Sequence, residues 1–330
     1  MSQLPELSPD EAARAGQTAR TVIDELDKVI LGQRRVLEEM VTALLAGGHA
    51  LLEGVPGTAK TLAIRVLALL VDQRFARIQF TPDLMPTDIT GVNVLNEIER
   101  RFDFHSGPVF HDIVLADEIN RAPAKTQAAL LEAMQERQVT VDGATHALPE
   151  GFTVFASQNP IEHEGTYPLP EAQLDRFLLK IAVGYPSEEA EVGILTRYAD
   201  GFDAGEPDSF PIARVLGRVE LSALRAAVRR VRVEPDVRVY IVALVRRTRQ
   251  EPTLSLGASP RAAVALFRAS QARAILEGRD FVTPDDVKSI APAALRHRVA
   301  LTAESEVEGA TADDRIALVL QTVQTPGARG

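Results

Sequence analysis

Short, nearly uninterrupted apolar runs alternate with longer segments of helical periodicity through the first two thirds of the chain. The apolar runs lie at residues 49–53, 75–80, 112–116, 152–156 and 177–183. Between them, residues 60–71 and 125–137 repeat apolar positions at the spacing of an α-helix. Strands that are apolar on both faces and separated by helices indicate a parallel sheet with helices on both sides. Right-handed crossovers bring the C-terminal strand ends to one edge, where we expect ligands to bind.

Two segments interrupt this alternation and predict β-hairpins. Residues 138–148 alternate around Asp142-Gly143, a dipeptide typical of a two-residue hairpin turn. Residues 91–107 alternate less regularly, on two arms joined by a charged stretch at 96–101. We expect both to be insertions in the α/β pattern, and the hairpin at 91–107 to have a charged tip.

From about residue 186 the strand pattern stops. Residues 205–211 resemble a linker, and helical patterns follow at 235–249, 259–276, 284–298 and 313–324. Ser259-Pro260 and Thr283-Pro284 are good helix starts, because a capping side chain precedes a proline in the first helical position. We therefore expect an α/β core over residues 1–205 and a separate all-helical domain over residues 206–330.

Composition excludes several classes of protein. The 330 residues include no cysteine, so disulfides and thiolate-bound metals are impossible. The apolar runs are too short to span a bilayer, and the acidic N-terminus does not resemble a secretory signal, so we expect a cytoplasmic protein without membrane insertion. Asp and Glu number 46 against 36 Lys and Arg, a net charge of −10 that argues against nucleic acid as the main ligand.

A phosphate-binding loop lies between the first predicted strand and the helix that follows it. Its residues are Gly54, Val55, Pro56, Gly57, Thr58, Ala59, Lys60 and Thr61. Backbone N–H groups of such a loop surround phosphate oxygens, and the helix N-terminus adds partial positive charge. We expect Lys60 to bridge the β- and γ-phosphates and the Thr61 hydroxyl to bind Mg²⁺.

One position departs from the usual loop pattern, which has glycine where this chain has Ala59. We expect this position to open the helix with negative φ, where a methyl group costs little. Gly57 is the position at which we expect positive φ.

An acidic pair ends the third predicted strand. Because residues 113–116 form a buried apolar run, Asp117 emerges at the C-terminal edge of the sheet beside the phosphate loop. There Asp117 can hold Mg²⁺ through water, and Glu118 is the candidate base that polarises the attacking water. An acidic pair at a strand end is common by itself, and the upstream phosphate loop is what favours the catalytic interpretation.

The strings 117–122 (Asp-Glu-Ile-Asn-Arg-Ala) and 125–136 resemble the MoxR family of AAA+ ATPases, and so does the form of the loop with Ala59. The resemblance runs from about Val29 to the helical tail. It implies an αβα core with strand order 5-1-4-3-2, two β-hairpin inserts and a C-terminal helical lid. It also implies assembly into a homo-oligomeric ring, usually a hexamer.

Further site residues follow from the resemblance alone. Asn159 matches the first sensor, which detects the γ-phosphate; Arg176 matches the arginine finger, which reaches the neighbouring subunit's nucleotide. Arg261 matches the second sensor and is expected to contact the γ-phosphate from the lid. The expected adenine contacts and the residue after the loop complete the nucleotide site: Val29, Ile30, Gln33 and Leu62. Without the resemblance, Asn159 would be an ordinary turn residue and Arg176 half of an ion pair at a helix end.

These features predict an Mg²⁺-dependent ATPase that acts as a chaperone-like remodeller of client proteins. The resemblance implies a partner with a von Willebrand factor A domain, in enzyme maturation or metal-cofactor insertion. The motor subunit of a metal-chelatase-like complex is the alternative, and an ATP-assembled scaffold with little turnover is a third. The preference for ATP over GTP rests on the resemblance.

Overall fold

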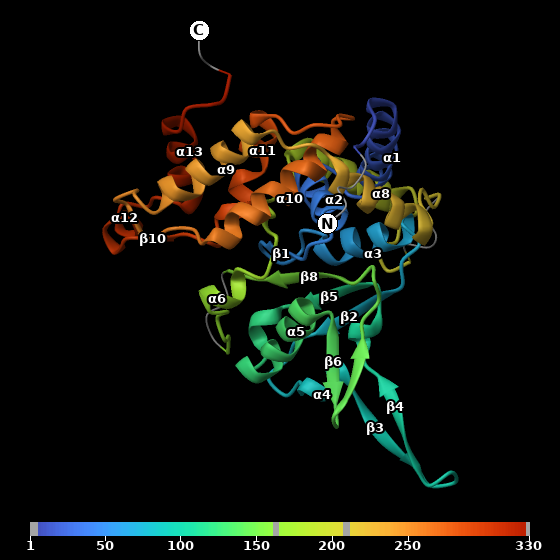
Figure 1. Ribbon diagram of the computed structural model, residues 1–330. Coiled ribbons are helices and arrows are strands. Elements are labelled where there is room, and N and C mark those ends of the chain that lie inside the picture. The colour runs from blue at the N-terminus through green and yellow to red at the C-terminus, as the bar shows by residue number, and fades with distance from the viewer. Residues whose placement is uncertain (1–5, 161–164, 207–211, 328–330) are drawn as a thin grey trace.

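The structure, a computed structural model, describes residues 6–160, 165–206 and 212–327. A five-stranded parallel sheet forms the centre of the first part of the chain (Figure 1). Its order is β2-β5-β8-β1-β9, which confirms the expected order 5-1-4-3-2 when the sheet strands are counted along the chain. The strands are β1 (Ala50–Glu53), β2 (Phe75–Gln79), β5 (Ile113–Asp117), β8 (Thr153–Gln158) and β9 (Leu179–Ala182).

Apolar side chains cover both faces of this sheet, as the unbroken apolar runs predict. In β1, Leu51 faces one hydrophobic cluster while Ala50 and Leu52 face the other. The Leu51 side is covered by α4 (Pro86–Thr90) and α5 (Ala124–Glu136), and the other side by α1 (Pro9–Asp27), α2 (Arg34–Leu45) and α3 (Lys60–Leu70). Helices α1 and α2 are absent from the elements that the sequence pattern predicts.

Both expected hairpins are present and extend away from the sheet (Figure 1). They are β3–β4 (Gly91–Asn96 and Arg101–Ser106) and β6–β7 (Gln138–Val141 and Ala144–Ala147). They touch each other, since Asn93 Nδ2 donates a 2.8 Å hydrogen bond to Asp142 Oδ2 and the Phe104 ring stacks on His146.

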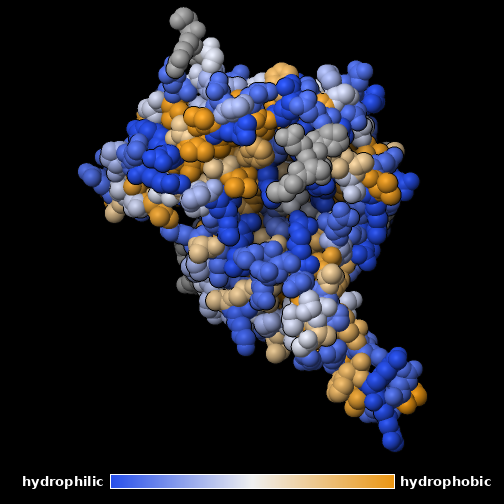
Figure 2. Space-filling model, in the orientation of Figure 1, coloured by the Kyte–Doolittle hydropathy of each residue, from blue (hydrophilic) through white to orange (hydrophobic). Residues whose placement is uncertain are grey.

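The tip of β3–β4 carries the expected charged stretch, and exposed apolar side chains lie within and beside it. Ile98 is 95% exposed in the turn, and Phe102 is 69% exposed in β4. Figure 2 shows orange, hydrophobic atoms among blue ones on the projecting end of the molecule. A two-stranded ribbon without a covering layer leaves such side chains in solvent, which sequence alternation by itself does not reveal.

The C-terminal part is helical, as expected. The predicted helices are α9 (Pro235–Thr248), α10 (Pro260–Leu276), α11 (Pro284–Leu295) and α13 (Ala312–Thr322). Ser259 and Thr283 cap α10 and α11 through their side chains. Unpredicted elements are α7 (Glu188–Ala199), α8 (Arg218–Arg230), α12 (Ala303–Val307), the small β10–β11 pair (Leu254–Leu256 and Ala300–Leu301) and α6 (Glu171–Leu174).

The helical lid shares a hydrophobic cluster with the sheet domain. The cluster on the α1–α3 side of the sheet continues into α8–α11 and α13. Helix α1 lies against α10, and a Cβ atom on Gly16 would be 2.4 Å from the carbonyl oxygen of Ile275. The N-terminal helix therefore binds the lid directly. Of the linker expected at 205–211, residues 207–211 lie outside the described residues.

Candidate functional site

A cavity of about 540 Å³ opens at the C-terminal edge of the sheet, where the parallel topology predicts a ligand site. It brings together segments that are far apart in the sequence: the turn after α1, the phosphate loop and the ends of β5 and β8. The predicted residues that line it are Val29, Ile30, Gln33, Gly54, Pro56, Gly57, Thr58, Ala59, Lys60, Thr61, Leu62, Asp117, Glu118 and Asn159.

The phosphate loop is held by close backbone approach and by its own lysine. A Cβ atom on Gly54 would lie 2.3 Å from the carbonyl oxygen of Val183, so a larger residue does not fit there. Gly57 has φ +81°, as predicted. Lys60 Nζ donates to the carbonyl oxygens of Gly54 at 2.8 Å and Val55 at 2.7 Å. Burial lowers the pKa of Lys60, while Asp117 and Glu118 raise it.

The prediction for the backbone at Ala59 was wrong. Ala59 has φ 58° and ψ 20°, in the left-handed region, and it is the N-cap of α3 rather than a helical residue. Glycine is usual at this position because it adopts positive φ without a steric penalty. Ala59 adopts it at a cost of roughly 1–2 kcal/mol, which a sequence motif alone does not show.

Asp117 lies beside Thr61 in the cavity, and both offer oxygen atoms. Thr61 Oγ1 and Asp117 Oδ2 are 3.5 Å apart, and Ser157 Oγ donates to Asp117 Oδ1 at 2.5 Å. Arg77 makes an ion pair of 2.7 Å with the same carboxylate. A hydroxyl and a carboxylate beside a phosphate loop are the donors that Mg²⁺ takes when nucleotide phosphates supply further ligands. The residues present therefore fit this metal.

Glu118 has strained backbone and two polar partners. Its φ of 55° is uncommon for a residue other than glycine, and such strain is typical of functional sites. Its Oε2 accepts hydrogen bonds from Gln79 Nε2 at 2.7 Å and Arg121 Nη1 at 3.0 Å. The sequence interpretation missed Gln79 and Arg121, and also Ser157 and Arg77. For Arg77 and Gln79, the one feature that could have pointed to the site is their position on β2, the strand that pairs with β5.

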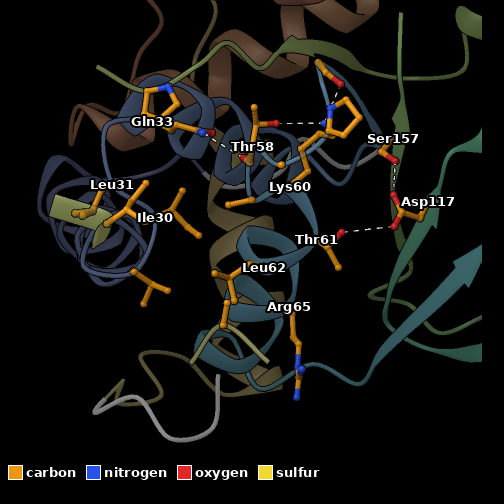
Figure 3. Close-up of a pocket in the computed structure, with 18 of the residues that line it drawn as sticks. Ile30, Leu31, Gln33, Thr58, Lys60, Thr61, Leu62, Arg65, Asp117 and Ser157 are labelled. Carbon is orange, nitrogen blue, oxygen red and sulfur yellow. Dashed lines mark hydrogen bonds between the residues drawn. The ribbon is translucent and has the colours of Figure 1, made fainter. Parts of the chain in front are cut away.

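The end of the cavity away from Asp117 is apolar. In Figure 3, Ile30 and Leu31 lie on one side, Asp117 and Ser157 on the other, and Lys60 and Thr61 between them. Gln33 Nε2 donates to the Thr58 carbonyl oxygen at 3.2 Å, which joins the apolar wall to the phosphate loop. Ile194, Tyr198 and Phe202, from α7 and the turn after it, complete the wall and were not predicted. This shape fits a flat base at one end and phosphates at the other.

The two predicted catalytic arginines lie elsewhere. Arg176 and Arg261 line a second cavity of about 330 Å³, and neither borders the first. The expected contact of Arg261 with the γ-phosphate from the lid stays a prediction, since Arg261 lines the second cavity. Within the described part of the chain, neither guanidinium has a hydrogen bond or ion pair.

Other site types find no support in the described residues. In residues 6–160, 165–206 and 212–327, no three His, Asp or Glu side chains cluster in a way that could hold a metal ion unaided. Over the same ranges, no helix has the length and apolar character needed to cross a membrane.

Comparison with known proteins agrees with this site. A model of the "ATPase family associated with various cellular activities (AAA)" matches residues 49–179, and one of the "AAA lid domain" matches residues 246–318. The chain is 45% identical to chaperone MoxR1 of Mycobacterium tuberculosis over 94% of this chain and 82% of that protein. It is 32% identical to protein MoxR of Methylorubrum extorquens, over 92% and 93% of the two chains.

The fold also has a close counterpart among solved structures. The crystal structure of a candidate ATPase from Cytophaga hutchinsonii superposes with a TM-score of 0.87. It is 39% identical in sequence, and the match covers 96% of this chain and 97% of that one. The phosphate loop, the acidic strand end, the helical lid and these similarities together show that the chain belongs to the MoxR family of AAA ATPases.

Proposed function

We propose that this protein hydrolyses ATP in a homo-oligomeric ring whose active sites lie between subunits. One observation carries the proposal: the first cavity gathers the phosphate loop, Asp117, Glu118 and Asn159, whereas Arg176 and Arg261 share a second cavity. A heterologous ring repeats one pair of unlike surfaces. It can therefore bring the two arginines of one subunit to the nucleotide of the next, as the resemblance implies for Arg176.

The residues of the first cavity have the chemistry that hydrolysis requires. Glu118 accepts a proton from water as the water oxygen attacks the γ-phosphorus. The bond from that phosphorus to the β–γ bridging oxygen breaks, giving ADP and inorganic phosphate. Asn159 orients the water, and Lys60 together with the arginines of the neighbour stabilises the charge that develops. Thr61 and Asp117 would hold Mg²⁺, which supplies further charge neutralisation when bound.

We propose that the energy of ATP hydrolysis is used to remodel client proteins, in enzyme maturation or metal-cofactor insertion. Kinship with a protein named chaperone MoxR1 supports this, as does the exposed apolar end of the β3–β4 hairpin. Exposed apolar side chains on a projecting element suit transient contact with other proteins. A von Willebrand factor A-domain partner, a hexameric ring and a cytoplasmic location belong to the same proposal.

Mixed rings test the shared active site. Glu118→Gln and Arg176→Ala subunits are each expected to form rings without ATPase activity. Mixed in equal amounts, they regain activity, because an intact Glu118 then meets an intact Arg176 at about one interface in four. Arg238→Ala, which changes an exposed lid arginine, is the matched control and should lower activity neither alone nor in mixtures. Both single variants must be shown to fold and to bind ATP. If their mixture is then as inactive as either variant alone, the proposal is refuted.

A further inference from the structure

A third cavity, of about 1100 Å³, lies at the edge of the sheet opposite the phosphate loop. Its core wall comes from residues that lie within three positions of the start of a sheet strand: Gly47 before β1, Gln73 before β2 and Asp112 before β5. Helices α8 and α10 of the lid form the other wall. The cavity is therefore separated from the predicted nucleotide site by the length of the sheet strands.

The charge of this cavity is opposite in sign to that of the protein. Five arginines and two carboxylates line it, although acidic residues outnumber basic ones in the whole chain. The arginines are Arg137, Arg218, Arg225, Arg229 and Arg268. Gathering like charges raises the free energy of the folded protein unless an anion offsets their repulsion.

Arg225 is the buried centre of the group, with only 8% of its surface exposed. It donates to the carbonyl oxygens of Leu44 and Gly151 and to Thr153 Oγ1, at 2.8, 3.2 and 2.9 Å. These contacts fix the guanidinium but bring no negative charge. Burial, together with the charges of Arg137 and Arg229, lowers the pKa of Arg225 to about 10, although Glu150 and Asp112 act in the opposite direction.

The carboxylates leave much of this charge uncompensated. Asp112 already makes ion pairs with Arg74 at 2.9 Å and Arg218 at 3.3 Å. Glu150 raises the pKa values of Arg137 and Arg225, but burial has the larger effect and both pKa values remain lowered. Across the described residues, the guanidinium groups of Arg229 and Arg268 make no hydrogen bond or ion pair, so their donors are available to a ligand.

We propose that this cavity is a second anion site that binds a polyphosphate chain, either inorganic or carried by a nucleotide. Guanidinium groups bind phosphate oxygens through paired N–H donors, and several arginines around one hollow suit a ligand with several adjacent negative charges. The excess of three arginines over carboxylates is comparable to the charge of a triphosphate. The volume is ample for such a chain.

The position of the site gives a bound anion a structural effect. Arg137 follows α5 of the sheet domain, while Arg229 and Arg268 lie on α8 and α10 of the lid. One ligand held by both walls would stabilise their present arrangement. This effect requires no hydrolysis, and the proposal stands or falls independently of the ATPase assignment.

Calorimetric titration of the full-length chain with sodium tripolyphosphate tests the site. The titrations use a Lys60→Ala background, in which the phosphate loop is weakened. We expect binding to persist there and to weaken at least tenfold on adding Arg229→Ala or Ser222→Asp, as expected for loss of a charged contact. Arg229 and Ser222 are exposed and line this cavity alone, so neither change threatens the fold. Arg238→Ala removes an equal charge from an exposed face of α9 and should change the affinity less than twofold.

Two further titrations separate the other sources of binding. Arg176→Ala with Arg261→Ala should leave tripolyphosphate binding intact, because these residues line only the second cavity. Titration of ATP into the same Lys60→Ala protein shows whether the site also binds a polyphosphate chain that is part of a nucleotide. If it does, ATP binding should also weaken on adding Arg229→Ala. No binding in the Lys60→Ala protein, or binding that depends on Arg176 and Arg261 but not on Arg229, would overturn the proposal.

Discussion

Ser259 Oγ donates a 3.0 Å hydrogen bond to Asp175 Oδ2, and this contact joins the lid to the sheet domain beside Arg176 and Arg261. The other oxygen of Asp175 accepts a 2.6 Å hydrogen bond from Arg298 Nε, which follows α11. Arg298 also donates to the carbonyl oxygen of Leu178 at 3.1 Å. The hydrogen bond between Ser259 and Asp175 therefore joins the segments that carry Arg261 and Arg176, although 84 residues separate Asp175 from Ser259.

Replacing Asp175 with asparagine should destabilise the joint between lid and sheet domain. The Arg298 side chain is only 2% exposed, and burial lowers its pKa while Asp175 raises it. Removing one partner of a buried ion pair leaves an uncompensated charge, so we expect a loss of about 3 kcal/mol in unfolding free energy. Urea denaturation measures this. Asp285→Asn, which affects an exposed pair with Lys288, should cost less than about 0.5 kcal/mol.

Gln79→Ala is expected to raise basal ATPase activity severalfold. Gln79 donates to the Glu118 carboxylate, and a carboxylate held in this way is less available to the attacking water. Because a hydrogen bond to a charged group contributes about 1.5–3 kcal/mol, releasing it lowers the barrier by part of that amount. Steady-state kinetics should show kcat raised with KM for ATP unchanged. Gln17→Ala on the exposed face of α1 is the control, and an unchanged or lower kcat for Gln79→Ala would contradict the idea.

Ala59→Gly should stabilise the protein. Ala59 has φ 58°, a conformation that costs an alanine roughly 1–2 kcal/mol and a glycine very little. Glycine also gains entropy in the unfolded chain, so the expected net gain is about 0.5 kcal/mol. Thermal denaturation and ADP titration measure it, with nucleotide affinity preserved. The same change at Ala223, on the exposed face of α8, should instead destabilise by about 0.5–1 kcal/mol. A comparable loss at Ala59 would show that its φ is not positive in solution.

Unfolding free energy should fall with acidification because of His49. This residue is buried; its Nδ1 accepts from the Val154 N–H at 2.9 Å, and Nε2 lies 3.3 Å from the Met134 carbonyl oxygen. Burial lowers the pKa of His49 to about 3. Between pH 6 and pH 4 the unfolded chain therefore binds a proton that the folded chain does not, and this residue contributes about 1.4 kcal/mol per pH unit.

Denaturation at a series of pH values tests this contribution. His49→Leu should be less stable at pH 7.5, because the Val154 N–H loses its acceptor, yet its stability should fall less steeply below pH 6. His105→Leu, on the exposed β3–β4 hairpin, should leave the wild-type pH dependence unchanged. If His49→Leu retains the full wild-type slope, the proton uptake belongs to another group.

Local sequence was sufficient to predict the sheet strands and, in the first cavity, the phosphate loop and the acidic pair, whereas the other predicted residues of that cavity followed from the family resemblance. Apolar runs with intervening helical periods specify the five parallel strands, because such strands must be buried on both faces. Parallel topology then places Asp117 beside the loop that contains Lys60, whichever lid follows. These predictions depend on residues close together in the chain and on topology rules, so no tertiary detail was needed.

Tertiary packing decided the rest. The φ of Ala59, the partners of Glu118 and the pairing of Arg176 with Arg261 depend on how segments distant in the sequence meet. The same holds for the arginine-lined cavity, whose charges come from both sheet domain and lid. Seen along the chain these arginines resemble solvated helix faces, since periodicity specifies which side of a helix is polar but not what that side will face.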